Sequence, residues 1–266
     1  HGGKIRYKSR VKKIIFKKGN AIGVALENDD EIYGKTVVSN ATRWDTFGGE
    51  GNDSPLVETN KTPRSETKWK NRYIPSPSFL SLHLGVREDA IPSTTHCHHL
   101  LLDTWEEMEK EQGVTFLSIP TLLDPTLAPS GSHIVHAFTP SSMDCWEGLN
   151  NKEYLAKKKD DGDKLISKLE KLFPSLNQNI LHKEIGSPRT HKRFLSRNKG
   201  SYGPIPAMRL PGLLPMPFNT TNIKGLYCVG DSCFPGQGLN AVAFSGYACA
   251  HIIGTKLGIN KWDLPE

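Results

Sequence analysis

The stretch from 225 to 246 holds residues whose types and order could do chemistry. An apolar run at 226–229, typical of a short buried strand, ends in Gly230-Asp231. An aspartate at the carboxyl end of a strand can accept hydrogen bonds from the hydroxyls of a ribityl or ribose chain, and a glycine beside it permits close backbone approach. A Gly-Asp pair alone is equally compatible with an ordinary turn, so the residues after Asp231 decide between a turn and a binding site.

Two glycines and a helix come after this aspartate. Gly236 and Gly238 are expected to let the loop turn tightly against a flat ring that a Cβ would block. The helix predicted from Leu239 presents unpaired N–H groups and the positive end of its dipole. Such an end suits the N1–C2=O2 edge of a flavin, where negative charge collects on reduction. The complete ordered string therefore favours a flavin site over a plain turn.

The elements that must position this segment begin with a β-meander. Turn residues separate three strand-like runs at 11–16, 21–26 and 32–39. A short helix is predicted at 43–47. Residues 48–78 are polar and rich in Gly and Pro, which predicts a loop or linker.

The middle of the chain predicts a mixed or antiparallel sheet and a long helix. Strands are expected at 79–84, 100–102, 115–119, 133–138 and 180–185. Asn150 and Glu153 form a capping box that opens a helix reaching about Leu172, and Gly162 is expected to bend or break it. Residues 200–222 are expected to cross the surface of a site, and the last helix ends at about 257 with Gly258 in the C′ position.

The bulk composition limits the function classes. The chain has 266 residues, of which 36% are hydrophobic and 23% charged, as expected for a packed protein rather than a disordered one. The net charge of +6 comes from scattered basic residues without stacking aromatics, so nucleic-acid binding is not expected. No apolar run approaches the ~20 residues of a membrane span, while a peripheral membrane contact stays open.

The cysteine and histidine patterns do not predict a metal site. The five cysteines lack CxxC spacing, so reduced and mostly buried thiols are expected. His96, His98 and His99 are close in sequence, but adjacent side chains on a strand point to opposite faces.

Several strings along the chain resemble one family. The chain is similar to the carotenoid desaturase/isomerase flavoproteins of the amine-oxidase-like FAD group, and two of its strings resemble the isomerase branch in particular. The strings are 37–47, 77–81, 97–99, 116–121, 144–149, 188–191 with 193–195, 216–221 and the 225–246 segment. The string at 188–191 (Pro-Arg-Thr-His) and the string at 216–221 (Met-Pro-Phe-Asn-Thr-Thr) are the more branch-specific ones. Two features depart from the family: no G-x-G-x-x-G unit occurs before the meander, and Leu239 and Asn240 stand where the isomerases have β-branched residues.

The resemblance implies an α/β fold with α+β elements: the C-terminal part of a Rossmann-like FAD-binding domain with an inserted mixed-sheet substrate domain. It implies FAD-binding segments at 1–47 and 223–266 and a substrate-binding domain at 48–222. Residues implied to bind FAD are Val11 at the adenine, Gly230 and Asp231 at the ribityl chain, Gly236 in the ring-contacting loop, and the backbone of Gly238, Leu239 and Asn240 at the pyrimidine. Asn40 is placed either beside the cofactor or in a simple turn.

The resemblance further implies an activity and a compartment. The implied reaction is cis-to-trans isomerisation of poly-cis lycopene with reduced FAD, in an apolar tunnel, with no net redox change and in the plastid. A related carotenoid desaturase or saturase, and a non-catalytic truncated remnant, are the alternatives. Without the dinucleotide-binding unit, the chain by itself is expected to bind FAD weakly or not at all.

Overall fold

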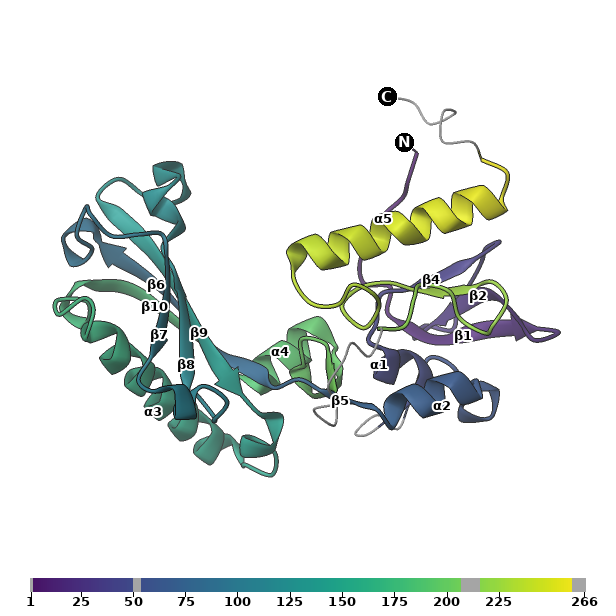
Figure 1. Ribbon diagram of the computed structural model, residues 1–266, viewed down its shortest axis with the longest axis horizontal. Helices are drawn as coiled ribbons and strands as arrows, with labels where there is room; N and C mark the ends of the chain where they lie inside the picture. The colour runs from purple at the N-terminus through teal and green to yellow at the C-terminus, as the bar shows by residue number, and fades with distance from the viewer. Residues whose placement is uncertain (1, 50–53, 207–215, 260–266) are drawn as a thin grey trace. The chain divides into compact units, whose positions relative to one another are not determined.

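The computed structural model describes residues 2–49, 54–206 and 216–259. The chain divides into two compact units (Figure 1): His1–Ser76 together with Tyr202–Glu266, and Pro77–Ser201. We call them the first and the second unit. The second unit is narrower than the 48–222 range predicted for substrate binding, and the functional assignment of both ranges stays a prediction.

The first unit opens with an antiparallel meander of β1 (Val11–Lys17), β2 (Asn20–Leu26) and β3 (Glu31–Tyr33). The expectation of one strand over 32–39 is wrong. After Gly34 the chain leaves the meander, and β4 (Val37–Ser39) pairs in parallel with the distant β12 (Leu226–Cys228). The β-branched run shows extended backbone but does not reveal its pairing partner, because both pairings suit the same residues.

The helices of the first unit are α1 (Arg43–Phe47), α2 (Arg64–Lys70) and α5 (Leu239–Lys256). The predicted helices at 43–47 and 239–257 are confirmed. α5 ends in a Schellman motif, since the N–H of Ile259 bonds to Gly254 O at 2.9 Å and the N–H of Gly258 bonds to Thr255 O at 3.1 Å.

The segment predicted as loop at 48–78 contains regular secondary structure among its described residues. α2 lies in it, and β5 (Tyr73–Pro75) pairs with β11 (Pro204–Pro206). Residues 50–53 of this segment and 207–215 of the predicted surface crossing lie outside the described residues. α2 and β5 were not predicted, because the prolines and charged residues around them are typical of a loop. Trp69 and Tyr73 are nevertheless buried, and their rings stack at 5.3 Å. A 3-10 helix also lies at Thr59–Lys61.

The second unit is a five-stranded antiparallel sheet in the order β10-β6-β9-β8-β7, with helix α3 packed on one face. The predicted strands are confirmed as β6 (Ser78–Arg87), β7 (His98–Leu102), β8 (Val114–Ser118), β9 (Ser132–Ser141) and β10 (Ile180–Gly186). Short 3-10 helices lie in its connections at Glu88–Ala90, Trp105–Glu107, Pro120–Leu122, Pro125–Leu127, Met143–Cys145, Asn177–Asn179 and Asn198–Gly200.

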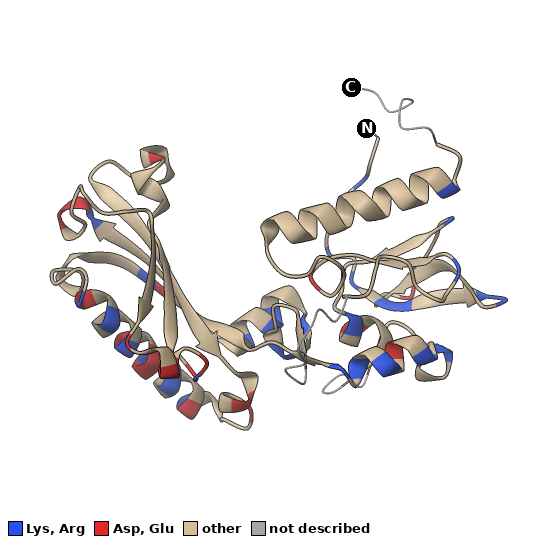
Figure 2. Ribbon diagram, viewed as in Figure 1, with Lys and Arg blue, Asp and Glu red and all other residues tan. Residues whose placement is uncertain are grey.

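Helix α3 (Asn151–Glu170) begins with the predicted capping box, in which Asn150 and Glu153 bond to each other's backbone N–H. The expected break at Gly162 is wrong, because the helix is continuous from Asn151 to Glu170. A Cβ on Gly162 would lie 2.3 Å from Ile185 Cδ1, so the glycine lets the helix pack closely on β10. Charged pairs such as Lys159 with Asp163 cover its outer side (Figure 2).

A helix that sequence reasoning missed is α4 (Pro188–Leu195), which begins after Ser187. Ser187 and Thr190 form a capping box, and Pro188 occupies the first helical turn. These start signals were present in the sequence, in Ser187 and the branch-specific Pro-Arg-Thr-His string that follows it.

Candidate functional site

The carboxyl ends of the parallel strands β4 and β12 bring two predicted site residues together. Val229 continues the pairing, with its N–H 2.9 Å from Ser39 O. The chain then reaches Asn40 on one side and Gly230-Asp231 on the other. Gly230 has φ +91°, and a Cβ built on it would lie 2.5 Å from Asn40 Oδ1. Gly230 is therefore required both by its backbone conformation and by the approach of Asn40.

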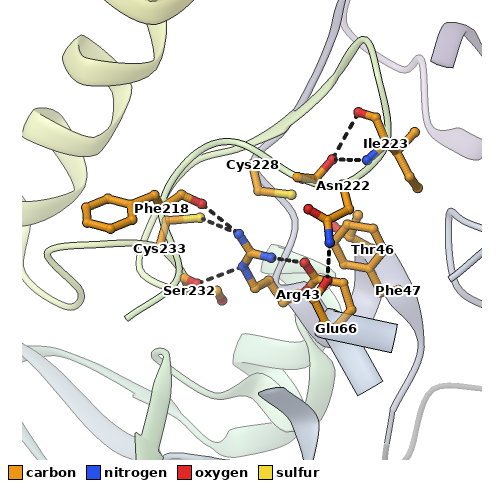
Figure 3. Close-up of polar contacts among 12 residues, drawn as sticks. Arg43, Thr46, Phe47, Glu66, Phe218, Asn222, Ile223, Cys228, Ser232 and Cys233 are labelled. Atoms are coloured by element: carbon orange, nitrogen blue, oxygen red, sulfur yellow. Dashed lines mark hydrogen bonds and ion pairs between the residues drawn. The ribbon is translucent and has the colours of Figure 1, made fainter. Parts of the chain in front are cut away.

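Arg43 fixes the loop after Asp231 (Figure 3). The side chain is 1% exposed and donates to Ser232 O at 3.2 Å and to Phe218 O at 2.9 Å. It also forms an ion pair with Glu66, at 2.6 Å between Arg43 Nη1 and Glu66 Oε1. One guanidinium thereby joins α1, α2 and both sides of the 218–233 segment, using the fixed fork geometry of its donors.

The electrostatics around Arg43 keep it charged while the nearby cysteines stay protonated. Burial opposes the charge of Arg43, but the ion pair with Glu66 keeps its pKa raised. Burial raises the pKa of Cys228 and Cys233 in spite of the adjacent guanidinium. Both residues are buried free thiols, which behave as small apolar side chains.

Asn219 joins β12 to α5. Its Nδ2 donates to Cys228 O at 2.9 Å and to Ser245 Oγ at 3.0 Å, and all of these groups are buried. Ser245 Oγ in turn accepts from the N–H of Gly230 at 3.3 Å. This network holds the helix against the strand end that carries Asp231.

The start of α5 is open to solvent. Its N-cap is Gly238, at φ +103°, and no side chain caps the first turn. Leu239 is 83% exposed and Asn240 is exposed beside it. Gly236 has φ +121°, and a Cβ on either glycine would meet nothing within 4 Å. Within this chain it is the backbone conformation, not a steric conflict, that requires glycine at both positions, and their contact with a flat ring stays a prediction.

Val11 lies apart from this group. It is the first residue of β1, in the separate meander sheet, where it pairs with Leu26. Its role at an adenine stays a prediction, as do the cofactor contacts of the other predicted residues. Arg43 and Asn219 were missed as positioning residues, because nothing in a sequence string shows that an arginine or asparagine is buried.

An apolar groove of about 860 Å³ lies along α5 beside β4. Val38 and Val229, residues of α5 between Gly246 and Thr255, and the three residues 257–259 that follow the helix line it. Within the described residues, β4 has a single strand neighbour, β12, so its other edge is unpaired. A two-stranded sheet with an unpaired edge next to an apolar groove is typical of a surface that packs against further structure.

Metal-ligand clusters and membrane-spanning helices are both absent from the described part of the chain. Residues 2–49, 54–206 and 216–259 contain no group of three or more His, Cys, Asp or Glu that could hold a metal ion. Over the same ranges, no helix has the length and apolar character needed to cross a membrane.

The family model described as flavin containing amine oxidoreductase matches residues 1–253. The chain belongs to this family. Membership confirms the predicted resemblance to the amine-oxidase-like group and, with the strand-end geometry, the predicted α/β flavoprotein fold with a separate antiparallel sheet.

Two plant relatives resemble the chain closely in sequence, and one solved structure resembles it in fold. It is 53% identical over 262 residues to the chloroplastic prolycopene isomerase of Arabidopsis thaliana, covering 98% of this chain and 43% of the relative. It is 54% identical over 262 residues to prolycopene isomerase 1 of an Oncidium hybrid cultivar, covering 98% and 44%. Cyclohexylamine oxidase of Brevibacterium oxydans matches in fold, with a TM-score of 0.59 and 15% identity over 94% of this chain and 49% of the oxidase. The chain spans less than half the length of the curated relatives it matches.

Proposed function

We propose that the strand ends of β4 and β12 and the start of α5 hold the ribityl and isoalloxazine part of FAD. The proposal is supported by the open glycine turn at Gly236 and Gly238, the strand-end carboxylate of Asp231 and the uncapped N–H groups at Leu239 and Asn240. A carboxylate suits ribityl hydroxyls, and a helix N-terminus suits the flavin edge that gains negative charge. The residues present thus fit the group.

The apolar groove beside β4 supports the idea that this chain holds one half of the cofactor and further structure holds the other half. We propose that further parallel structure of a longer chain covers the free edge of β4 and holds the pyrophosphate and adenosine half of FAD. The 266-residue chain alone is then expected to bind FAD weakly or not at all. Val11 is proposed to meet the adenine.

The proposed activity is cis-to-trans isomerisation of carotenoid double bonds, with poly-cis lycopene as substrate and the plastid as compartment. The observation that carries it is the 53% identity to a chloroplastic prolycopene isomerase over 98% of the chain. Reduced FAD would supply the electrons that transiently lower the bond order of a conjugated double bond. Arg43 and Asn219 would act by holding the loop and α5, and Asp231 would bind the ribityl chain.

The cofactor proposal is tested in the full gene product that carries this sequence. Asp231→Ala is expected to lower FAD affinity by about 1–3 kcal/mol, because the ribityl hydroxyls lose a charged acceptor. Asp89→Ala, at an exposed aspartate of the second unit, is the matched control. Affinity is measured by quenching of flavin fluorescence, and equal affinity of both variants would remove Asp231 from the site.

The reaction is tested by anaerobic incubation of the same protein, loaded with reduced FAD, with poly-cis lycopene. Appearance of all-trans product without consumption of electrons supports the isomerase. Stoichiometric reduction of an acceptor would instead indicate a desaturase. A protein that binds neither FAD nor carotenoid would be a non-catalytic remnant.

A further inference from the structure

The five-stranded sheet of the second unit ends in two edge strands, β10 and β7. Within the described residues, each of them has a single strand neighbour, which is β6 for β10 and β8 for β7. A free edge presents unpaired backbone N–H and C=O groups, to which another strand can pair. Proteins commonly protect such an edge with charged side chains.

The two edge strands differ in this protection. β10 carries His182, Lys183 and Glu184 in succession, and all three are exposed. β7 has the sequence His-His-Leu-Leu-Leu, which contains no Lys, Arg, Asp or Glu. Leu100, at its centre, is 59% exposed. The free edge of β7 therefore lacks charged residues and carries an exposed leucine, which is typical of an edge that pairs with another strand.

The pairing of β7 with β8 determines which of its backbone groups face the free edge. The N–H of Ile119 donates to Cys97 O at 2.8 Å, so the backbone of Cys97 faces β8, and the antiparallel register continues from there along β7. Backbone groups of successive residues alternate in direction along a strand. The N–H and C=O groups of His98, Leu100 and Leu102 therefore face away from β8, toward the free edge.

These three residues are self-complementary about a two-fold axis. An antiparallel pair of β7 strands centred on Leu100 places Leu100 opposite Leu100 of a second copy, and His98 opposite Leu102. Every outward-facing backbone group then meets an outward-facing group of the other copy. Because each such residue pair exchanges two hydrogen bonds, about six backbone hydrogen bonds result.

The side chains at the two ends of β7 suit the same register. His96 and His98 lie at its beginning and are exposed. Asp103 and Glu106 follow its end and are also exposed, with Asp103 Oδ1 3.1 Å from Lys171 Nζ. The two-fold axis brings the histidine end of one copy beside the acidic end of the other, where imidazole N–H groups can donate to carboxylates.

We propose that the free edge of β7 binds a second copy of this chain in an antiparallel strand pair centred on Leu100, which joins two five-stranded sheets into one. The proposal is independent of the cofactor and of the substrate. An unrelated strand could use the same backbone groups, but a second copy also matches the central leucine and the histidine and acidic ends. A five-residue edge is about 17 Å long and smaller than the interfaces of permanent dimers, so a reversible dimer with a micromolar dissociation constant is expected.

The first test measures the mass in solution of the full gene product that carries this sequence, by sedimentation velocity from about 1 to 100 μM. The wild type is expected to be a concentration-dependent dimer. Leu100→Lys is expected to raise the dissociation constant about ten-fold or more, because the pairing then sets two like charges opposite each other and loses two leucine contacts. Leu181→Lys is the matched control, because Leu181 is 54% exposed and lies on β10, the other edge strand.

The second test mixes variants of opposite charge to locate the centre of the register. Leu100→Glu is expected to dissociate like Leu100→Lys, while an equimolar mixture of the two is expected to form a heterodimer, because the opposite charges then face each other. The pair Leu102→Lys and Leu102→Glu is the control. Leu102 faces His98 of the other copy in the proposed register, so mixing these two variants is expected to bring no gain in association.

Three results would overturn the inference. A wild type that stays monomeric at about 100 μM would show that no second copy pairs with β7, as when another strand of a longer chain covers this edge. Equal effects of Leu100→Lys and Leu181→Lys would remove the β7 edge from the interface. A mixture of the two Leu100 variants that does not associate, or a mixture of the two Leu102 variants that associates as well, would refute the register centred on Leu100.

Discussion

Replacing Arg43 by methionine tests whether this residue fixes the loop after Asp231. The variant leaves Glu66 buried and charged, at 5% exposure, and removes the donors to Phe218 O and Ser232 O. Breaking a buried ion pair by deleting one partner costs about 3–5 kcal/mol, because the other charge stays without compensation. Such a loss is a large share of the ~5–15 kcal/mol by which proteins are stable.

The assay is urea unfolding, with hydrogen exchange of the amides in 226–234 as the local readout. In Arg43→Met these amides are expected to exchange faster, since Val229 and Cys233 bond within the loop and strand end that Arg43 holds. Arg10→Met is the matched control. Arg10 pairs with Glu27 at 3.2 Å, but both side chains are more than 60% exposed, so little change is expected.

The double variant Arg43→Met with Glu66→Leu separates charge from packing. It removes the buried charge as well, so it is expected to recover part of the lost stability. A loss of less than about 1 kcal/mol in the free energy of unfolding of Arg43→Met would refute the reasoning, because leaving a buried carboxylate unpaired costs more than that. A double variant as unstable as the sum of the single variants would refute the role of the ion pair.

Two further predictions concern Gly230, at the end of β12, and His136, on β9 of the second unit. Gly230→Ala is expected to cost about 1–3 kcal/mol in urea unfolding, from φ +91° and the 2.5 Å approach to Asn40 Oδ1. Gly19→Ala, at φ +78° with nothing within 4 Å, should cost clearly less, and equal costs would contradict the steric part. Burial lowers the pKa of His136, so the folded state binds its proton more weakly than the unfolded chain. Stability is therefore expected to be lost as the pH falls below about 6.5, and His136→Asn should flatten this dependence in urea midpoints measured from about pH 7.5 to 5.

The sequence by itself determined the local conformations of the candidate site. An apolar run ending in Gly230-Asp231, the glycines before Leu239 and Gly258 after the last helix specify a strand end, an open turn and a capped helix. These features depend on φ/ψ preferences and on hydrogen bonds between residues a few positions apart, which a sequence states directly. The capping box of Asn150 and Glu153 was predictable for the same reason.

Tertiary structure alone decided which distant residues meet. Sequence indicated an extended run at 32–39 but not its parallel pairing with β12, and no local pattern showed that Arg43 would bond to a carbonyl 189 residues away. The stacking of His83 on His136 likewise depends on the register of β6 with β9. Such contacts depend on which surfaces close against each other when the chain buries its apolar area, and no short sequence pattern records that choice.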